Sequence, residues 1–363
     1  MADRVASLRS RPGEPSRAFS ALVGHTLPAA DLRPADLLID PTRFPSEGDW
    51  AFCRFDDERI PALRMGFQRG GFNVWPEDRP VDPELLQLHL EVLTADGAHL
   101  WLPTGTRSAA LLLTDPTVKD IRLAQDGLDL LRISGWPSMS WYARSDDDAL
   151  EVALTVDVGS VTVLPDCLLP HAVFAMWETV GDARGWVRIG AETTPVRGRM
   201  FYDHTRVLHR EHALPGRQGY LYTTLALDDG GALLGYHATD VLGQPIEDYC
   251  FGVHVDAVGH GTFLPDTGAP EIELDADGLP ARYRIDWRGP HLAVTADVTV
   301  RPMPIIRAWG SPAAPTSRAA FPILPLVLDA RVTLEGATGP ATQRGIGLAE
   351  HFDATAWAAQ IPD

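Results

Sequence analysis

The sequence contains few cysteines, and none of them is placed for a metal or redox site. Cys53, Cys167 and Cys250 lie far apart, are odd in number and form no CxxC pair. Disulfide frameworks and cysteine-based zinc sites need paired or closely spaced cysteines. The sequence therefore predicts neither a disulfide framework nor a cysteine metal site.

Basic runs and long apolar runs are missing as well. Lys and Arg number 31 against 49 Asp and Glu, which gives a net charge of −18. Nucleic acids and anionic membranes attract basic patches, so neither is an expected partner. No segment approaches the roughly 20 apolar residues of a membrane span, and the N-terminus lacks the apolar core of a secretion signal. We expect a cytoplasmic protein without stable membrane insertion.

The short motifs of several common enzyme classes are absent too. The chain has no Gly-x-Ser-x-Gly elbow, no His-Glu-x-x-His, no P-loop, and no Gly-x-Gly-x-x-Gly after a strand. Such motifs position a nucleophile, a metal ion or phosphate groups. Their absence argues against serine hydrolases, zinc proteases, and nucleotide or nicotinamide enzymes.

What the chain does contain is a long series of short alternating segments separated by turn residues. Period-2 alternation bounded by Gly, Pro, Asn and Asp predicts antiparallel strands joined by hairpins. Examples are DWAFCRF, LLQLHLEVL, LDLLRISG, YLYTTLAL and ARYRIDW. Short helices are expected only near residues 117–124 and 354–360. The predicted fold class is all-β, with strands spaced as in a sandwich or barrel.

The strands form two groups, which predicts two domains. Residues 1–44, rich in Arg, Pro and Ala, are expected to form an extended N-terminal arm. One β domain is then expected over residues 45–212 and a second over 213–363. An aromatic strand leads into Asp56-Asp57 in the first group and into Asp228-Asp229 in the second. We interpret this parallel as a sign of two related β units.

Residues 194–212 hold the densest mixture of ionisable and aromatic side chains in the chain. In a strand, alternation places Tyr202, His204 and Arg206 on one face. A neutral imidazole between a phenol and a guanidinium can act as a general base, and the adjacent carboxylate of Asp203 can fix its tautomer. The alternative is a solvated strand face, with Arg206 pointing outward and pairing with Glu211.

A metal site is not expected in this segment. His204, His209 and His212 are separated by 5 and 3 residues. This spacing matches neither a helical i, i+4 pair nor a common ligand set of two histidines and a carboxylate. The ten tryptophans are mostly expected in the core. A few can line a ligand cavity, and the candidates are Trp136, Trp141, Trp177 and Trp186.

Four motifs, taken in order and spacing, resemble a known group of proteins. They are Asp49-Trp50-Ala-Phe52, the Gly-x-x-x-Tyr-Asp-His of 198–204, the aromatic strand pair of 220–236 and the Gly-x-Gly-Leu-x-Glu of 345–350. Together they resemble the two-lipocalin-domain proteins, which include carotenoid 1,2-hydratases, AttH-like proteins, kievitone-type hydratases and lipocalin-like Diels-Alderases. The resemblance covers about residues 45–353.

The resemblance implies two lipocalin-like antiparallel β-barrel or sandwich domains in tandem. It also implies an active pocket near the Asp-His motif and chemistry without a metal or organic cofactor. Asp203 and His204 match that motif, and Tyr236 matches the tyrosine of the following unit. The further candidates for substrate contact are Trp177, Trp186, Tyr220, Tyr222, Asp240 and Glu350.

The sequence departs from the hydratase pattern at Arg206, where an aromatic residue is expected, and at Val207, where a glycine is. A guanidinium would repel a carbocation but can hold a carbonyl, carboxylate or phosphate with parallel donors. We therefore expect a cofactor-independent enzyme for an apolar, terpenoid or polyketide-like molecule with a polar end.

The expected reaction is hydration or dehydration, isomerisation, or cyclisation. In this hypothesis His204 exchanges a proton, Asp203 orients it, Tyr202 or Tyr236 donates a hydrogen bond, and Arg206 holds a substrate oxygen. The alternative is a non-catalytic lipid or natural-product binder, because a lipocalin-like fold does not specify catalysis.

Overall fold

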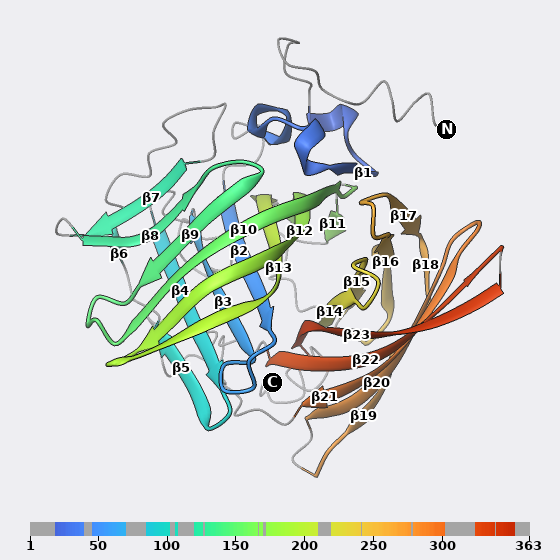
Figure 1. Ribbon diagram of the computed structural model, residues 1–363. Helices are drawn as coiled ribbons and strands as arrows, with labels where there is room; N and C mark the ends of the chain where they lie inside the picture. Colours follow the sequence, from blue (N-terminus) through green and yellow to red (C-terminus); the bar gives the residue numbers. More distant parts are fainter. Residues whose placement is uncertain are drawn as a thin grey trace, which may run out of the picture. The chain divides into compact units, whose positions relative to one another are not determined.

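A computed structural model shows a chain built almost wholly of β-strands in two compact units (Figure 1). Unit 1 comprises Met1–Asp166 and Phe174–Leu208, and unit 2 comprises Cys167–Val173 and His209–Asp363. The predicted all-β class is confirmed. The structure describes residues 19–39, 46–69, 85–101, 106–107, 120–125, 128–165, 167–169, 172–209, 219–240, 242–276, 279–301, 324–337 and 339–352.

None of the helical segments in these ranges has the length and apolarity needed to cross a bilayer.

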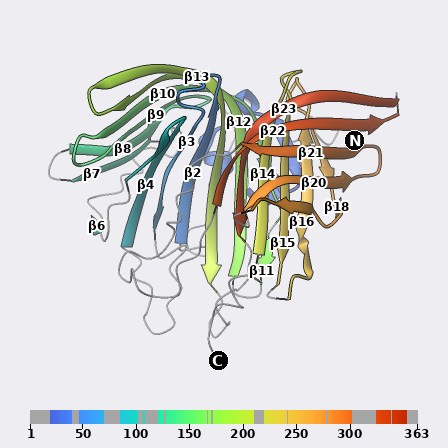
Figure 2. The ribbon, with the colours of Figure 1, turned by 90° about the horizontal axis from the view of Figure 1, so that it is seen from below.

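Unit 1 is one large sheet in which almost every strand pairs with its neighbour along the chain. Its strands are β2 (Ser46–Phe55), β3 (Ala62–Arg69), β4 (Leu85–Thr94), β5 (Gly97–Trp101), β6 (Thr106–Arg107), β7 (Asp120–Gln125), β8 (Leu128–Ser134), β9 (Ser138–Arg144), β10 (Leu150–Val163), β12 (Ala172–Ile189) and β13 (Glu192–His209). The order across the sheet is β5-β4-β3-β2-β13-β12-β10-β9-β8-β7. Figure 2 shows β4, β3 and β2 side by side.

One expected helix is a strand instead. The short helix predicted near residues 117–124 falls on β7, which pairs with β8. Ile121 and Leu123 are buried while Arg122 between them is exposed. This period of two is that of a half-buried strand, so pairing with β8 decides the local structure. The other helix expected, at residues 354–360, lies outside the described residues.

The described part of the N-terminal segment is packed onto unit 1, where an extended arm was expected. It contains η1 (Phe19–Ala21), β1 (His25–Pro28), η2 (Ala29–Asp31) and η3 (Pro34–Leu37), and β1 pairs with β10. Its large buried apolar side chains are Leu22, Leu27, Leu32, Leu37 and Ile39. These apolar groups hold the segment on the sheet because burying each one is worth about 1.5–3 kcal/mol.

Two indole N–H groups donate hydrogen bonds to this segment. The Trp136 N–H donates to the carbonyl of Leu32 at 2.9 Å, and the Trp177 N–H donates to the carbonyl of Leu37 at 3.0 Å. The two rings meet edge to face, with centroids 6.3 Å apart. The N-terminal segment is therefore coupled directly to the strand that carries Trp177.

Unit 2 repeats the connectivity of unit 1. Its strands are β11 (Cys167–Leu169), β14 (Gly219–Leu227), β15 (Ala232–Thr239), β16 (Pro245–Val255), β17 (Gly261–Leu264), β18 (Asp266–Thr267), β19 (Glu271–Leu274), β20 (Pro280–Arg288), β21 (Ala293–Arg301), β22 (Leu324–Gly336) and β23 (Gly339–Phe352). The main order is β17-β16-β15-β14-β23-β22-β21-β20-β18, and β18 also lies against β16, so the sheet nearly closes. As β2 pairs with β3 and β13, so β14 pairs with β15 and β23.

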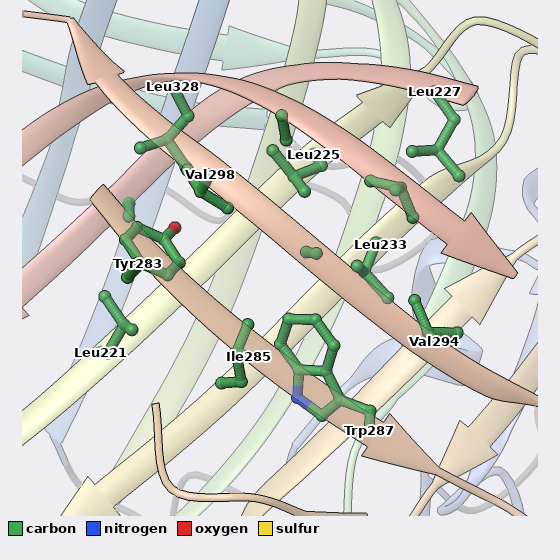
Figure 3. Packing of buried hydrophobic residues seen from close by; sticks show 14 of the residues in the cluster. Leu221, Leu225, Leu227, Leu233, Tyr283, Ile285, Trp287, Val294, Val298 and Leu328 are labelled. Carbon is green, nitrogen blue, oxygen red and sulfur yellow. The ribbon is translucent and has the colours of Figure 1, made fainter. Parts of the chain in front are cut away.

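The core of unit 2 is an apolar cluster that includes Trp287 (Figure 3). Trp287, on β20, is fully buried among residues such as Leu233, Ile285 and Val294. Its ring lies on the backbone of β15. A Cβ atom added at Gly235 would lie 2.3 Å from Cζ2 of Trp287. Glycine at this position is thus a requirement of packing, since protein cores leave no spare volume.

We predict that Gly235→Ala destabilises unit 2, because the new methyl group would overlap the Trp287 ring. Overpacked cores typically lose about 1–3 kcal/mol. Gly336→Ala is the matched control, because the nearest atoms to its added Cβ lie 4.0 Å away. Chemical denaturation should show a loss of stability in Gly235→Ala but not in Gly336→Ala. In a Trp287→Phe background, where the ring is smaller, Gly235→Ala should cost less stability. Equal stabilities of the two alanine variants would contradict the packing described.

Candidate functional site

The antiparallel pairing of β13 with β2 assembles a buried polar cluster in unit 1. In the register, His204 lies opposite Asp49 and Arg206 lies opposite Glu47. His204 Nδ1 is 3.2 Å from Asp49 Oδ2, and Arg206 Nη2 is 2.9 Å from Glu47 Oε2. Tyr202, two residues before His204 on the same strand, donates its hydroxyl to Asp49 Oδ1. Alternation along β13 therefore delivers all three side chains to one face.

The Asp49 carboxylate is the centre of this cluster. It is fully buried, and its two oxygens face different partners, the Tyr202 hydroxyl and the His204 ring. A buried carboxylate is costly unless charged or hydrogen-bonding groups surround it. His204 Nδ1 is close to Asp49 Oδ2 without being aligned for a hydrogen bond. Such contacts often tighten when a substrate binds.

Tryptophan rings enclose the cluster on its apolar side. Trp177 stacks on the His204 imidazole, with centroids 5.1 Å apart and an interplanar angle of 30°. Tyr202 meets Trp141 and Trp177 edge to face at 4.9 and 5.1 Å. Because Trp177 is also hydrogen-bonded to Leu37, the N-terminal segment helps to fix the ring against His204.

Asp203 does not take the place that the motif suggested. Strand alternation directs it to the face opposite His204, where it accepts a hydrogen bond from Thr205 Oγ1 at 2.6 Å. The carboxylate beside His204 belongs to Asp49. Asp49 begins one of the sequence motifs, but its role could not be inferred from the sequence, because only the pairing of β2 with β13 brings it to His204.

Arg206 lies at the edge of the cluster and not on a solvated face. Its side chain is 11% exposed and pairs with Glu47, whereas Glu211, the partner considered for an outward orientation, lies outside the described residues.

The donor set of the cluster resembles a metal site in type. Ligand atoms of Glu47, Asp49 and His204 all lie within 4.8 Å of one another, and the three residues are buried. Two carboxylates and an imidazole can bind a divalent cation. Here Arg206 pairs with Glu47 and Tyr202 with Asp49, so an ion would compete with both. The expected absence of a metal cofactor stays a prediction.

A second buried polar cluster, which the sequence did not reveal, lies on β3 and β4. Arg64 Nε is 3.0 Å from Glu91 Oε2, His89 Nε2 is 3.2 Å from the same oxygen, and Trp50 meets His89 edge to face. Burial and the Arg64 charge lower the pKa of His89 to about 4. Burial raises the pKa of Glu91, but Arg64 and His89 outweigh it and lower the value overall. The sequence feature that could have indicated this cluster is a histidine and a glutamate two residues apart in an otherwise apolar strand.

Four candidate residues gather on one face of unit 2. Tyr222 lies opposite both Tyr236 and Glu350 in the register, and the Tyr220 hydroxyl donates to Glu350 Oε2 at 3.3 Å. The Tyr222 and Tyr236 rings are 4.8 Å apart, and Tyr236 contacts Phe251 at 4.9 Å. These four candidate residues therefore lie close together, and the assignment of Tyr220, Tyr222 and Glu350 to substrate contact stays a prediction. The assignment of Tyr236 to catalysis stays a prediction.

Asp240 and Trp186 lie in other surroundings. Asp240 Oδ1 accepts the backbone N–H groups of Leu242 and Gln244, so this carboxylate shapes a turn. Trp186 is partly exposed and lies opposite Ala153 in the pairing of β12 with β10, where it lines a surface groove.

Comparisons with known proteins support the fold. No protein-family model and no curated protein sequence matches the chain. Among solved structures the chain is similar to a protein described as AttH from Nitrosomonas europaea, with a TM-score of 0.58, 13% identity, and coverage of 95% of this chain and 99% of that one. It is also similar to kievitone hydratase from Nectria haematococca, with a TM-score of 0.53, 10% identity, and coverage of 96% and 98%. The tandem lipocalin-like fold implied by the sequence resemblance is confirmed.

Tyr202→Phe should destabilise the protein, because it removes a buried hydroxyl that donates to a charged carboxylate. Hydrogen bonds to charged groups contribute about 1.5–3 kcal/mol. Tyr142→Phe is the matched control, since its hydroxyl donates to Glu151 at 2.8 Å in a more exposed position. We expect a loss below about 1 kcal/mol there. Urea unfolding of both variants measures the difference, and equal losses would contradict a special role for the Asp49 contact.

The pKa of His89 predicts that the protein loses stability in mild acid. Folded His89 stays neutral down to about pH 4, whereas unfolded His89 takes up a proton below its ordinary value of about 6.5. Stability therefore falls as the pH drops from 6.5 towards 4. Lowering the pH from 7 to 5 should reduce the free energy of unfolding of His89→Gln by less than it reduces that of wild type. The difference, measured by urea unfolding, should be up to about 2 kcal/mol.

His260→Gln is the control for this measurement, because the His260 side chain is 58% exposed. It should keep the acid sensitivity of wild type. His237, whose pKa burial also lowers to about 4, leaves a residual pH dependence in His89→Gln. If the stability of His89→Gln depends on pH as that of wild type does, His89 is not held neutral in the folded protein.

Proposed function

We propose that unit 1 carries a cofactor-independent acid–base site for an apolar small molecule with an oxygen function. The observation that carries the proposal is a buried imidazole, His204, placed between the Asp49 carboxylate and the Trp177 ring. The shared fold with a hydratase is consistent with it. The site would supply hydration or dehydration, isomerisation or cyclisation.

His204 is the group that exchanges a proton with the substrate. The Asp49 charge beside Nδ1 favours a proton on that nitrogen, which leaves Nε2 as the base. Asp49 is itself positioned by the Tyr202 hydroxyl. A carboxylate, an imidazole and an orienting donor form the arrangement of a positioned general base, for which rate gains of about 10²- to 10⁴-fold are typical.

Arg206 supplies the positive charge that such chemistry needs at a substrate oxygen. It follows His204 by two residues on the same strand face, a step of about 7 Å, and Glu47 fixes its position. If His204 removes a proton next to a carbonyl group, negative charge develops on the carbonyl oxygen, where a guanidinium can stabilise it. Return of the proton at another carbon gives isomerisation. Loss of the β-hydroxyl, which takes the proton from His204 and leaves as water, gives dehydration.

The test is proton exchange with solvent. Purified protein is incubated in D₂O with a panel of apolar enones, prenylated phenols and polyene ketones, and deuterium incorporation and mass change are followed by mass spectrometry. We expect His204→Gln and Asp49→Asn to reduce the exchange of an accepted substrate by at least about 100-fold. Arg206→Gln should reduce it as well, and Arg206→Lys should restore only part, since lysine lacks the planar donor pair.

Asp203→Asn is the matched control, because this carboxylate lies on the other face of β13. It should retain activity within about threefold of wild type, a change below 1 kcal/mol in the barrier. A His204→Gln protein with full exchange would overturn the proposal. Retention of a panel compound without exchange or mass change would favour a binding protein instead.

A further inference from the structure

A groove in unit 1 is lined by neither Asp49 nor His204. It has a volume of about 610 Å³ and is lined by residues of β7, β8, β9, β10 and β12. The register aligns five of these residues in one row across the strands. In order they are Trp186, Ala153, Tyr142, Arg132 and Arg122.

The hollow in this row arises from side-chain size. Ala153 stands between Trp186 and Tyr142, and its neighbours along the floor, Thr155 and Ser140, are also small. Trp186 and Tyr142 are two strand spacings apart, about 10 Å between backbones. A planar ring stacked on two aromatic neighbours needs roughly 3.5–4 Å on each side, so a single flat ring system fits above Ala153.

The Tyr142 wall of the hollow is held in place by hydrogen bonds. The Tyr142 hydroxyl donates to Glu151 at 2.8 Å, and Arg188 Nε donates to the other oxygen of that carboxylate at 2.9 Å. A preorganised wall lowers the entropic cost of binding.

The groove is positively charged in a strongly acidic protein. Arg122, Arg132 and Arg184 line it, with one lining carboxylate, Asp129. Arg122 holds Asp129 at 2.6 Å, whereas Arg132 is 3.8 Å from it, and the Arg132 side chain is 54% exposed. Arg184 is engaged by Asp157 at 2.8 Å. Arg132, next to Tyr142 in the row, is thus the arginine best placed to receive an anion.

We propose that this groove is a binding site for planar aromatic carboxylates. The ring system lies above Ala153 between Trp186 and Tyr142, and the Arg132 side chain reaches over Tyr142 to the carboxylate. The flat apolar surface favours a planar aromatic ring, and the partly exposed guanidinium favours a carboxylate, so the groove selects a ligand that has both groups. The site is independent of the reaction proposed at His204.

The probe is 2-naphthoate, titrated into the full-length protein by isothermal calorimetry. We expect saturable binding with a dissociation constant of about 1 mM or below. Neutral 2-naphthamide and non-planar cyclohexanecarboxylate should each bind at least fivefold more weakly. Arg132→Gln should weaken naphthoate binding about tenfold, and Ala153→Leu should abolish it by filling the hollow.

Arg282→Gln, which removes an exposed arginine of β20 in unit 2, is the control and should bind as wild type does. Unchanged thermal unfolding of each variant shows that it is folded. The proposal is overturned if wild type shows no saturable binding, or if 2-naphthamide binds as tightly as 2-naphthoate. A wild-type dimer that Ala153→Leu dissociates would also overturn it, because the groove would then belong to a second copy of the chain.

Discussion

The register between β2 and β13 is the constraint on which the candidate site depends. A shift of one residue would carry every side chain of β13 to the other face, replacing Tyr202, His204 and Arg206 by Asp203 and Thr205. The register that forms sets His204 against Asp49 and Arg206 against Glu47. One strand pairing thus matches two acidic residues with two basic residues that lie more than 150 positions away in the sequence. It joins the first long strand of unit 1 to its last.

Packing around the cluster explains how these charges are kept in an apolar interior. Desolvated ions are costly, and the cost is offset only when each ion has a close partner. The aromatic rings of Trp141 and Trp177 exclude water, and Trp177 in turn is hydrogen-bonded to the N-terminal segment. Low polarity strengthens the remaining electrostatic contacts. The same arrangement gives a general base a dry, ordered environment, so stability and the proposed chemistry rest on the same side chains.

Much of the fold could be predicted from sequence, because antiparallel strands with one face in the core alternate visibly. The strand pairs around Trp50 and Tyr222 and the tandem units were found in this way. Strand β7 was misread because a segment of six residues carries too little periodicity to separate the two structures. Tyr202, His204 and Arg206 were placed on a common face by alternation alone.

What could not be predicted was the identity of the partners across the sheet. Asp49 and Glu47 reach His204 and Arg206 through long-range pairing, which local spacing does not encode. The same limit hid the Arg64, His89 and Glu91 cluster, whose members come from two strands. Asp203 was favoured because it adjoins His204 in sequence, yet neighbours in a strand point to opposite faces. The site residues on β13 could thus be predicted from the period of the strand, whereas their partners on β2 follow only from the topology of the sheet.

The most direct test of the account is the tautomer of His204, read from long-range ¹⁵N–¹H spectra of the labelled protein. The proton of the neutral His204 ring should reside on Nδ1, facing Asp49, and Asp49→Asn should shift this preference. A proton on Nε2 in wild type, unaffected by Asp49→Asn, would contradict the pairing of these two residues as an acid–base unit.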